Sequence, residues 1–330
     1  MLDLPERKIV KQFYAEPITE PEITPLGNGL VNTTYLVSSS DETGVLQKIS
    51  PNIPAEQTLD YTIVSDFLNS KGWELPTIRK TLQGYYYFAD EQGNNWRLTN
   101  YLSSTGTPNS VKMSGGRSYG SLLASLHLDL SLLEHVPSYQ IPNFHDTAYY
   151  AKQLEVALPH IPNETAQKYG EVILCCYSEQ QPLEAMPEQL VHGDPKLDNI
   201  LHRNGVPFTL IDWDTLMIGN PLVDLGDMLR SLTPKFDSAS SSPLAGPLTL
   251  IDAYYEKAKP RLQKTSFREV ALRAGMLLSL ELAMRYLADY DSSKPYFNWD
   301  KEKYKSHYDS NFVKSIQTMR TVSLLSGVSD

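Results

Sequence analysis

Apolar and polar residues alternate in several short runs of the first hundred residues, as they do in strands with one buried face. Five runs are rich in β-branched and aromatic residues: 23–26, 31–37, 45–49, 85–89 and 96–101. Helical patterns cover 6–14 and 55–68. This part of the chain therefore predicts a small, mainly antiparallel sheet with one main helix.

The remainder is dominated by longer apolar patterns of helical period. These cover 116–127, 145–157, 164–178, 247–258, 266–290 and 308–325. Between them, residues 189–214 predict strands, with Asn204-Gly205 as the turn of a hairpin. We therefore expect an α+β chain with two lobes, a sheet-containing N-lobe over 1–102 and a mainly helical C-lobe over 103–330.

Charge and composition limit the possible partners. The 330 residues carry 39 acidic and 29 basic side chains, a net charge of −10, which disfavours nucleic acid and anionic membranes. No apolar stretch is long enough to span a membrane, and the N-terminus lacks a signal-peptide pattern. We expect a cytoplasmic protein without an obligate protein partner, and we expect Cys175 and Cys176 to be buried free thiols.

Three polar residues surround the predicted hairpin. Asp194 and Asn199 precede its first strand, and Asp212 follows its second strand. Because hairpin strands bring their outer ends together, Asn199 and Asp212 should lie close to each other. Their oxygens suit Mg²⁺, which leaves Asp194 free to accept the proton of an acceptor hydroxyl. This division of roles is typical of ATP-dependent phosphoryl transfer.

The segment His192-Gly193-Asp194 with Asn199 five residues later resembles the catalytic loop of the aminoglycoside phosphotransferase and choline kinase superfamily. Residues 211–214 and 219–227 resemble its metal-binding strand and the loop that follows. The resemblance implies a protein-kinase-like fold, with Asp194 as catalytic base and Asn199 and Asp212 as Mg²⁺ ligands. We expect His192 to orient the loop through hydrogen bonds, with direct proton transfer as the alternative.

Asp224 lies in the same motif. We expect it to accept backbone amides behind the catalytic loop, with direct metal contact as the alternative. Lys48 on the strand 45–49 is expected near the α- and β-phosphates, unless it is only a solvated strand lysine. The helix that follows offers Asp60 or Glu56 as its partner. Asp60 is the better aligned, although the superfamily commonly uses Glu there.

Two further segments are expected to contact the nucleotide. The segment Gly27-Asn28-Gly29 is not a Walker loop, because no Gly-Lys-Ser/Thr follows it. In this fold Gly29 would lie over the phosphates, with Asn32 or Thr33 as donors; a tight hairpin turn is the alternative. The connector from Asn100 to Leu102 is expected to bind adenine through backbone groups.

Three pairs of segments resemble N-acetylhexosamine 1-kinases: 29–37 with 46–52, 211–217 with 224–227, and 284–290 with 296–297. The resemblance implies a sugar as the small-molecule acceptor. We expect Arg285 and Tyr296 to contact it beside Asp194. Alternatively, Arg285 joins Glu281 and Asp289 in an intrahelical ion-pair stack.

Two other functions stay open. One is a kinase of an aminoglycoside, choline-like or amino-alcohol acceptor. The other is a pseudokinase that binds nucleotide without turnover. Its only support is Asp60, which stands where the superfamily commonly has Glu.

Overall fold

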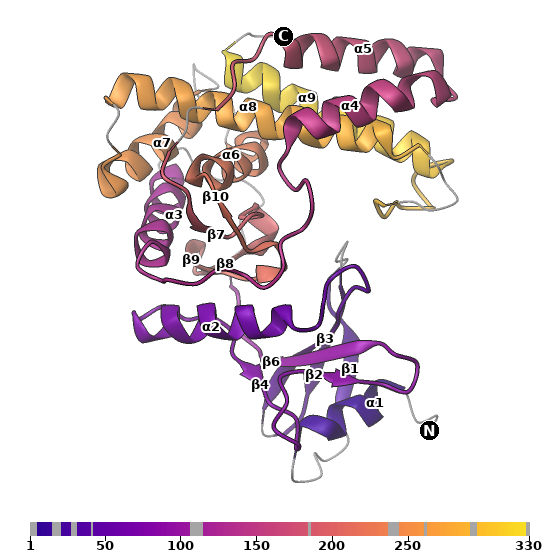
Figure 1. Ribbon diagram of the computed structural model, residues 1–330, viewed down its shortest axis with the longest axis vertical. Helices are drawn as coiled ribbons and strands as arrows, with labels where there is room; N and C mark the ends of the chain where they lie inside the picture. The colour runs from indigo at the N-terminus through magenta and orange to yellow at the C-terminus, as the bar shows by residue number, and fades with distance from the viewer. Residues whose placement is uncertain are drawn as a thin grey trace.

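The computed structural model describes residues 5–14, 21–27, 32–40, 42–105, 115–183, 186–236, 244–260, 263–290 and 296–327. It has an antiparallel sheet in its N-terminal part and a larger, helical C-terminal part (Figure 1). The expected α+β, bilobal architecture is confirmed, whereas the exact boundary after residue 102 stays a prediction. Among the described residues, no helix combines the length and the apolar character needed to cross a membrane.

The N-lobe sheet is antiparallel at every pairing among the described strands. Its order is β1 (Glu22–Pro25), β2 (Thr33–Ser38), β3 (Thr43–Lys48), β6 (Asn95–Asn100) and β4 (Ile78–Arg79), with β5 (Phe88–Ala89) also pairing with β6. Leu46 and Leu98 pack on one face against α1 (Pro5–Val10) and the 3₁₀ turn Lys11–Phe13.

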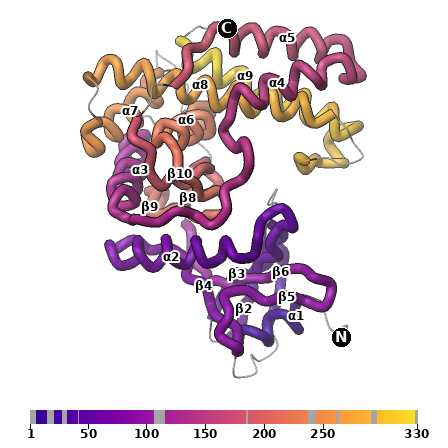
Figure 2. Tube along the Cα trace, viewed as in Figure 1, coloured from indigo at the N-terminus to yellow at the C-terminus, as the bar shows by residue number. Residues whose placement is uncertain are grey.

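Helix α2 (Gln57–Ser70) lies between the sheet and the C-lobe, and Figure 2 follows the chain along it. Its buried side chains Tyr61, Val64 and Leu68 belong to the same apolar cluster as residues of the C-lobe. The two lobes therefore share a core at this helix, in addition to the connecting chain.

The C-lobe is organised around α8 (Lys264–Ala288), and other helices pack along it. These are α4 (Thr147–Ala157), α5 (Glu164–Ser178), α6 (Pro221–Leu232), α7 (Ala245–Ala258) and α9 (His307–Ser326), while α3 (Gly116–Leu130) packs mainly on α7. A Cβ at Gly226 of α6 would lie 2.7 Å from the Ala274 carbonyl oxygen of α8. This glycine lets the two helices approach closely.

The expected hairpin is present as β8 (Ile200–Arg203) and β9 (Val206–Leu210), with Asn204 and Gly205 both at positive φ. A second small sheet pairs β7 (Gln189–Val191) with β10 (Met217–Gly219).

Two expectations about the C-lobe were wrong. Residues 219–227 were expected to form a loop, but α6 begins at Pro221, where Asn220 caps it by accepting a hydrogen bond from Leu222 N at 3.0 Å. Cys175 is exposed and Cys176 is partly exposed, so the two thiols are not buried as expected.

Candidate active site

The expected catalytic loop, residues 192–199, begins after β7, and Asp224 of α6 fixes its backbone. The backbone amides of His192 and Gly193 donate to the Asp224 carboxylate at 2.9 and 2.8 Å, the contacts expected for this residue. His127 also approaches it, at 3.0 Å. Burial alone would raise the pKa of Asp224, but the hydrogen bonds from His127 and the loop hold it below its usual value. Asp224 is therefore an ionised anchor for the loop.

The backbone conformation at Gly193 requires a glycine. Its φ is +85°, and a Cβ there would lie 2.3 Å from the Thr215 carbonyl oxygen. His192 packs beside it, with Nε2 at 3.1 Å from the Ile211 carbonyl and Nδ1 accepting from Asp194 N at 3.2 Å. Burial lowers the pKa of His192. These contacts make it a neutral orienting residue.

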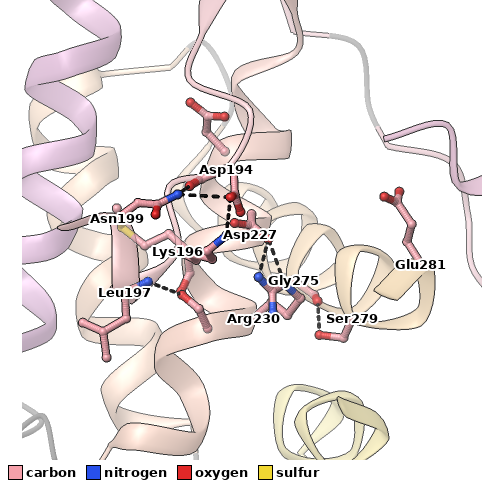
Figure 3. A network of polar contacts seen from close by, with 12 residues as sticks. Asp194, Lys196, Leu197, Asn199, Asp227, Arg230, Gly275, Ser279 and Glu281 are labelled. Carbon is pink, nitrogen blue, oxygen red and sulfur yellow. Dashed lines mark hydrogen bonds and ion pairs between the residues drawn. The ribbon is translucent and has the colours of Figure 1, made fainter. Parts of the chain in front are cut away.

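Asp194 lies in the centre of a polar network (Figure 3). Its carboxylate forms a short ion pair with Lys196 and accepts from Asn199 Nδ2 at 3.0 Å. Burial raises the pKa of Asp194, although the charge of Lys196 opposes this. The sequence motifs did not predict a role for Lys196, although it lies only two residues after Asp194 on the same loop.

A second ion pair lies beside the first. Arg230 of α6 binds Asp227 through Nη2 and Nε at 2.7 and 2.8 Å, and both side chains are largely buried (Figure 3). The negative charge of Asp227 raises the pKa of Asp194 and the positive charge of Arg230 lowers it. Nothing in the sequence singled out Arg230.

Asp212 lies where the metal site was expected. The Ile211 amide donates to the Asn199 carbonyl at 2.8 Å, so Asn199 and Asp212 lie at the same end of the hairpin. Asp212 has a left-handed backbone, with φ +69°. Burial and the negative charges of Asp214 and Asp194 raise the pKa of Asp212 to about 6. The charges of Lys196 and Arg97 oppose this rise only in part, so the position favours a further cation.

These donors fit a divalent cation. Asn199 uses its amide nitrogen on Asp194, so its amide oxygen is the atom suited to a metal. Within the described part of the chain, no three or more His, Cys, Asp or Glu residues gather into a possible metal cluster. A site with Asn199 and Asp212 as protein ligands, completed by phosphate and water oxygens, matches the preference of Mg²⁺.

Asp214, two residues after Asp212, does not belong to the expected metal site; its carboxylate contacts side chains of the N-lobe. Arg97 of β6 pairs with it through Nη1 and Nη2 at 2.6 and 2.8 Å, and Asn32 Nδ2 donates to it at 2.5 Å. The side chains of Arg97 and Asp214 are only 3% and 5% exposed. The two lobes are thus joined by a buried ion pair two residues from Asp212, the expected metal ligand. Asn32, expected to donate to a phosphate, has its amide nitrogen in this network.

The expected pairing of Lys48 with Asp60 was wrong. Asp60 accepts from His135 Nε2 at 2.8 Å and from Ser138 N at 2.9 Å, both in the C-lobe. Lys48 Nζ lies 5.9 Å from the centre of the Trp96 ring, on the sheet face that carries Leu46. Glu56, the other candidate, is exposed and lies 3.4 Å from the Tyr87 hydroxyl.

Strand alternation explains this difference. Lys48 shares a sheet face with Leu46, which packs on the N-terminal helix, so the opposite face belongs to Gln47. Gln47 lies directly across from Arg97 and accepts from its Nε at 2.9 Å. Arg97, which the sequence did not single out, is therefore the cation that β6 presents towards the C-lobe.

The other expected nucleotide contacts remain predictions. Gly29 lies outside the described residues. Asn100 ends β6, and its side-chain oxygen accepts from Thr77 N at 2.6 Å. Leu102 follows in the connector between the lobes, where adenine binding was expected.

Arg285 on α8 is surrounded by aromatic rings. Four ring centres lie 5.0 to 5.8 Å from its guanidinium carbon, those of Phe144, Tyr150, Tyr296 and Phe297. It also donates to the Tyr296 hydroxyl at 3.3 Å and lies 3.9 Å from Glu281. The alternative, a three-residue ion-pair stack, does not form, because Asp289 binds His307 at 2.9 Å and backbone amides instead.

Solved structures with the same fold cover nearly all of the chain. A microcompartment-associated aminopropanol kinase matches 97% of this chain and 95% of its own, with 14% identity and a TM-score of 0.64. The GDP complex of an aminoglycoside 2′-phosphotransferase-IIIa matches 97% and 99%, with 13% identity and a TM-score of 0.64. An amicoumacin kinase in complex with AMP-PNP, Ca²⁺ and Ami matches 97% and 91%, with 12% identity and a TM-score of 0.63.

A family model also matches the sequence directly. It covers residues 22–261, which include β1 to β6, the catalytic loop, the hairpin and α6. The match extends over more than half of the chain and includes Asp194, Asn199 and Asp212. The chain belongs to the phosphotransferase enzyme family.

Proposed function

We propose that this protein is an ATP- and Mg²⁺-dependent kinase that phosphorylates a hydroxyl of a small molecule, a sugar such as an N-acetylhexosamine, at its anomeric position. The observation that carries this proposal is the cluster around Asp194. The partly buried carboxylate of Asp194 lies beside Lys196, and Asn199 and Asp212, whose pKa is raised to about 6, complete the cluster. Phosphoryl transfer requires these groups because the protein mainly positions the reactants and neutralises charge.

In the proposed reaction, the acceptor oxygen forms a bond to the γ-phosphorus as the bond to the β,γ-bridging oxygen breaks. ADP leaves, and the acceptor proton moves to the Asp194 carboxylate. Burial raises the pKa of Asp194, which makes it a better base than an exposed aspartate. Lys196 supplies positive charge where the phosphoryl group is transferred. Asn199 and Asp212 would hold a Mg²⁺ ion, whose charge neutralises the triphosphate.

The charge pattern around Asp194 supports a neutral acceptor over a polycationic one. Three carboxylates of this region have a basic partner, and the fourth, Asp212, is the expected Mg²⁺ ligand. Lys196 pairs with Asp194, Arg230 with Asp227, and His145 with Glu281. A polycationic antibiotic would instead need carboxylates whose charge is not already balanced.

Aromatic side chains near Arg285 support a sugar ring as the acceptor. Tyr296 is 56% exposed, and Tyr150 and Phe144 lie beside the same guanidinium. An aromatic face with a fixed guanidinium and carboxylate is a usual way to hold a sugar. The chain Tyr296–Arg285–Glu281–His145 connects this surface to Gly193, next to Asp194.

A second acceptor class is an amino alcohol or aminoglycoside, because structures with this fold include an aminopropanol kinase and an aminoglycoside phosphotransferase. ATP consumption should be measured across sugars, aminoglycosides and amino alcohols. Turnover confined to sugars is the expected result. Turnover confined to amino alcohols or aminoglycosides would show that the acceptor is an amine and not a sugar. ATP binding without any turnover would identify a pseudokinase.

A further inference from the structure

His145 lies outside every motif, between the catalytic loop and α8. Its Nε2 is 2.6 Å from the carbonyl oxygen of Gly193, the residue before Asp194. Its Nδ1 is 3.2 Å from Glu281 Oε1 on α8. The two side chains are 6% and 2% exposed. His145 therefore links the loop that carries the catalytic base to the helix that carries Arg285.

The two contacts determine the protonation of this histidine. A backbone carbonyl only accepts hydrogen bonds, and an ionised carboxylate does the same. Glu281 accepts a hydrogen bond from Thr147 at 3.1 Å and lies 3.9 Å from Arg285, contacts that suit a carboxylate. Both ring nitrogens must then donate, which only the imidazolium form can do. Burial alone would lower the pKa of His145, but Glu281 raises it, and the net direction is upward.

The backbone around His145 is unusual as well. Asn143 and His145 both have left-handed φ values, +58° and +60°. Left-handed conformations cost free energy in residues other than glycine and persist where the surroundings fix them. Here the contacts of the imidazole ring with Gly193 and Glu281 fix the turn in this conformation.

The charges that face His145 come from three elements. Glu281 and Arg285 belong to α8, Asp227 to α6, and Asp194 follows the contacted carbonyl in the catalytic loop. Loss of the His145 proton would leave one ring nitrogen without a hydrogen to donate and would remove the charge that balances Glu281. Either the loop contact or the helix contact would then be lost.

We propose that His145 is a positioning residue which, as an imidazolium, ties the catalytic loop to α8 and so holds Asp194 in place for the acceptor. The assignment rests on the proposed kinase function. Because Arg285 shares Glu281 Oε1 with His145, an acceptor that binds Arg285 acts on the same carboxylate that fixes the loop.

His145→Gln tests the role in turnover. Glutamine can donate to the Gly193 carbonyl but carries no charge, so kcat should fall about 10- to 100-fold while the KM for ATP changes less than about twofold. His160→Gln is the matched control, because His160 is exposed and stacks on Tyr290. Native kcat in His145→Gln, or an equal rise in both KM values, would overturn the assignment.

Glu281→Gln tests the same link without removing the ring. The pKa of His145 should fall, and the alkaline limb of the kcat profile should move to lower pH. Nitrogen-15 NMR of the full chain should show both ring nitrogens of His145 protonated at about pH 7.5, where a free histidine with a pKa of about 6.5 is mostly neutral.

These signals should be absent in His145→Gln and titrate at lower pH in Glu281→Gln. A neutral His145 at that pH would overturn the proposal. If the wild-type protein phosphorylated no acceptor, the proposed kinase function would be contradicted. The NMR titration does not depend on turnover, so it tests the protonation of His145 separately.

Discussion

Arg97 of β6 and Asp214 of the metal-binding segment form a bidentate ion pair, with N–O distances of 2.6 and 2.8 Å, that joins the two lobes. Asp214 is two residues from Asp212, whose left-handed backbone places it at the proposed Mg²⁺ position. Arg97 lies across from Gln47, on the sheet face opposite Lys48, and contacts the proposed metal site through Asp214.

Replacing Arg97 by Met should leave Asp214 buried without its counter-charge. We expect the free energy of unfolding to fall by about 3–5 kcal/mol, since breaking one side of a buried pair has that cost. The affinity for ATP should fall as well. Lys48→Met is the comparison, with a change in stability within about 0.5 kcal/mol. Urea unfolding and calorimetric ATP titration measure both effects, and a larger loss in Lys48→Met would contradict the role given to Arg97.

Lys196→Met should slow the chemical step. The lysine balances the charge of Asp194 and lies where the γ-phosphoryl group would be transferred, so we expect kcat to fall about 10²- to 10³-fold. Without Lys196, the pKa of Asp194 should rise further, and the acid limb of kcat should move to higher pH. The exposed Lys301 provides a control in Lys301→Met. An unchanged acid limb would argue against the pairing of Lys196 with Asp194 during turnover.

Asp212 should make the metal-free protein less stable as pH rises. Its folded-state pKa of about 6 lies above the ordinary value of 3.8, so the folded state binds the extra proton between these values. The stabilisation of the folded state by this bound proton is therefore lost as pH increases from about 4 to about 6. Asp212→Asn should raise the unfolding free energy at about pH 7.5, without Mg²⁺, by up to about 3 kcal/mol, since one pKa unit corresponds to about 1.4 kcal/mol.

The same variant should abolish stabilisation by Mg²⁺ with nucleotide. In the wild type, Mg²⁺ affinity should weaken below about pH 6, because the ligand must be deprotonated. Asp198→Asn, in an exposed position of the same loop, serves as the control. Thermal unfolding with chelator and with Mg²⁺ checks both statements, and a less stable Asp212→Asn protein in chelator would contradict them.

Arg285→Ala should raise the KM for the acceptor about 10-fold or more, the usual scale for a lost charge-assisted contact, with little change in that for ATP. Tyr296→Phe keeps the ring and removes only the hydroxyl that Arg285 contacts, so its effect should be smaller. Steady-state kinetics against both substrates measures the split. Equal effects on the two KM values would assign Arg285 a structural role in holding Glu281.

The fold could be predicted from the sequence where the pattern of apolar and polar residues is regular. Alternation predicted the sheet, and the Asn204-Gly205 turn placed Asn199 and Asp212 at one end of a hairpin. The same alternation cannot say which face of a strand borders the second lobe, and the structure places Lys48 on the face of Leu46 and Trp96 rather than beside Asp60. Helix α6 was missed because Gly219, Asn220 and Pro221 read as a loop, although Asn220 and Pro221 start the helix.

Long-range contacts had no local signal. Arg97 and Asp214 are 117 residues apart, and His145 and Glu281 are 136 residues apart. Only the three-dimensional arrangement of β6, α6 and α8 brings these charges to the catalytic loop. The motif therefore predicted which groups react, while the side chains that contact them could be found only from the structure.

The role of Asp194 as the base that activates an acceptor hydroxyl is tested most directly by phosphorus-31 NMR. Wild-type protein and Asp194→Asn would each be incubated with ATP, Mg²⁺ and an N-acetylhexosamine. We predict a sugar phosphate signal that grows in step with ADP in the wild type, and a rate at least about 100-fold lower in the variant with ATP binding retained. Equal rates in the two proteins, or release of inorganic phosphate alone, would contradict the account.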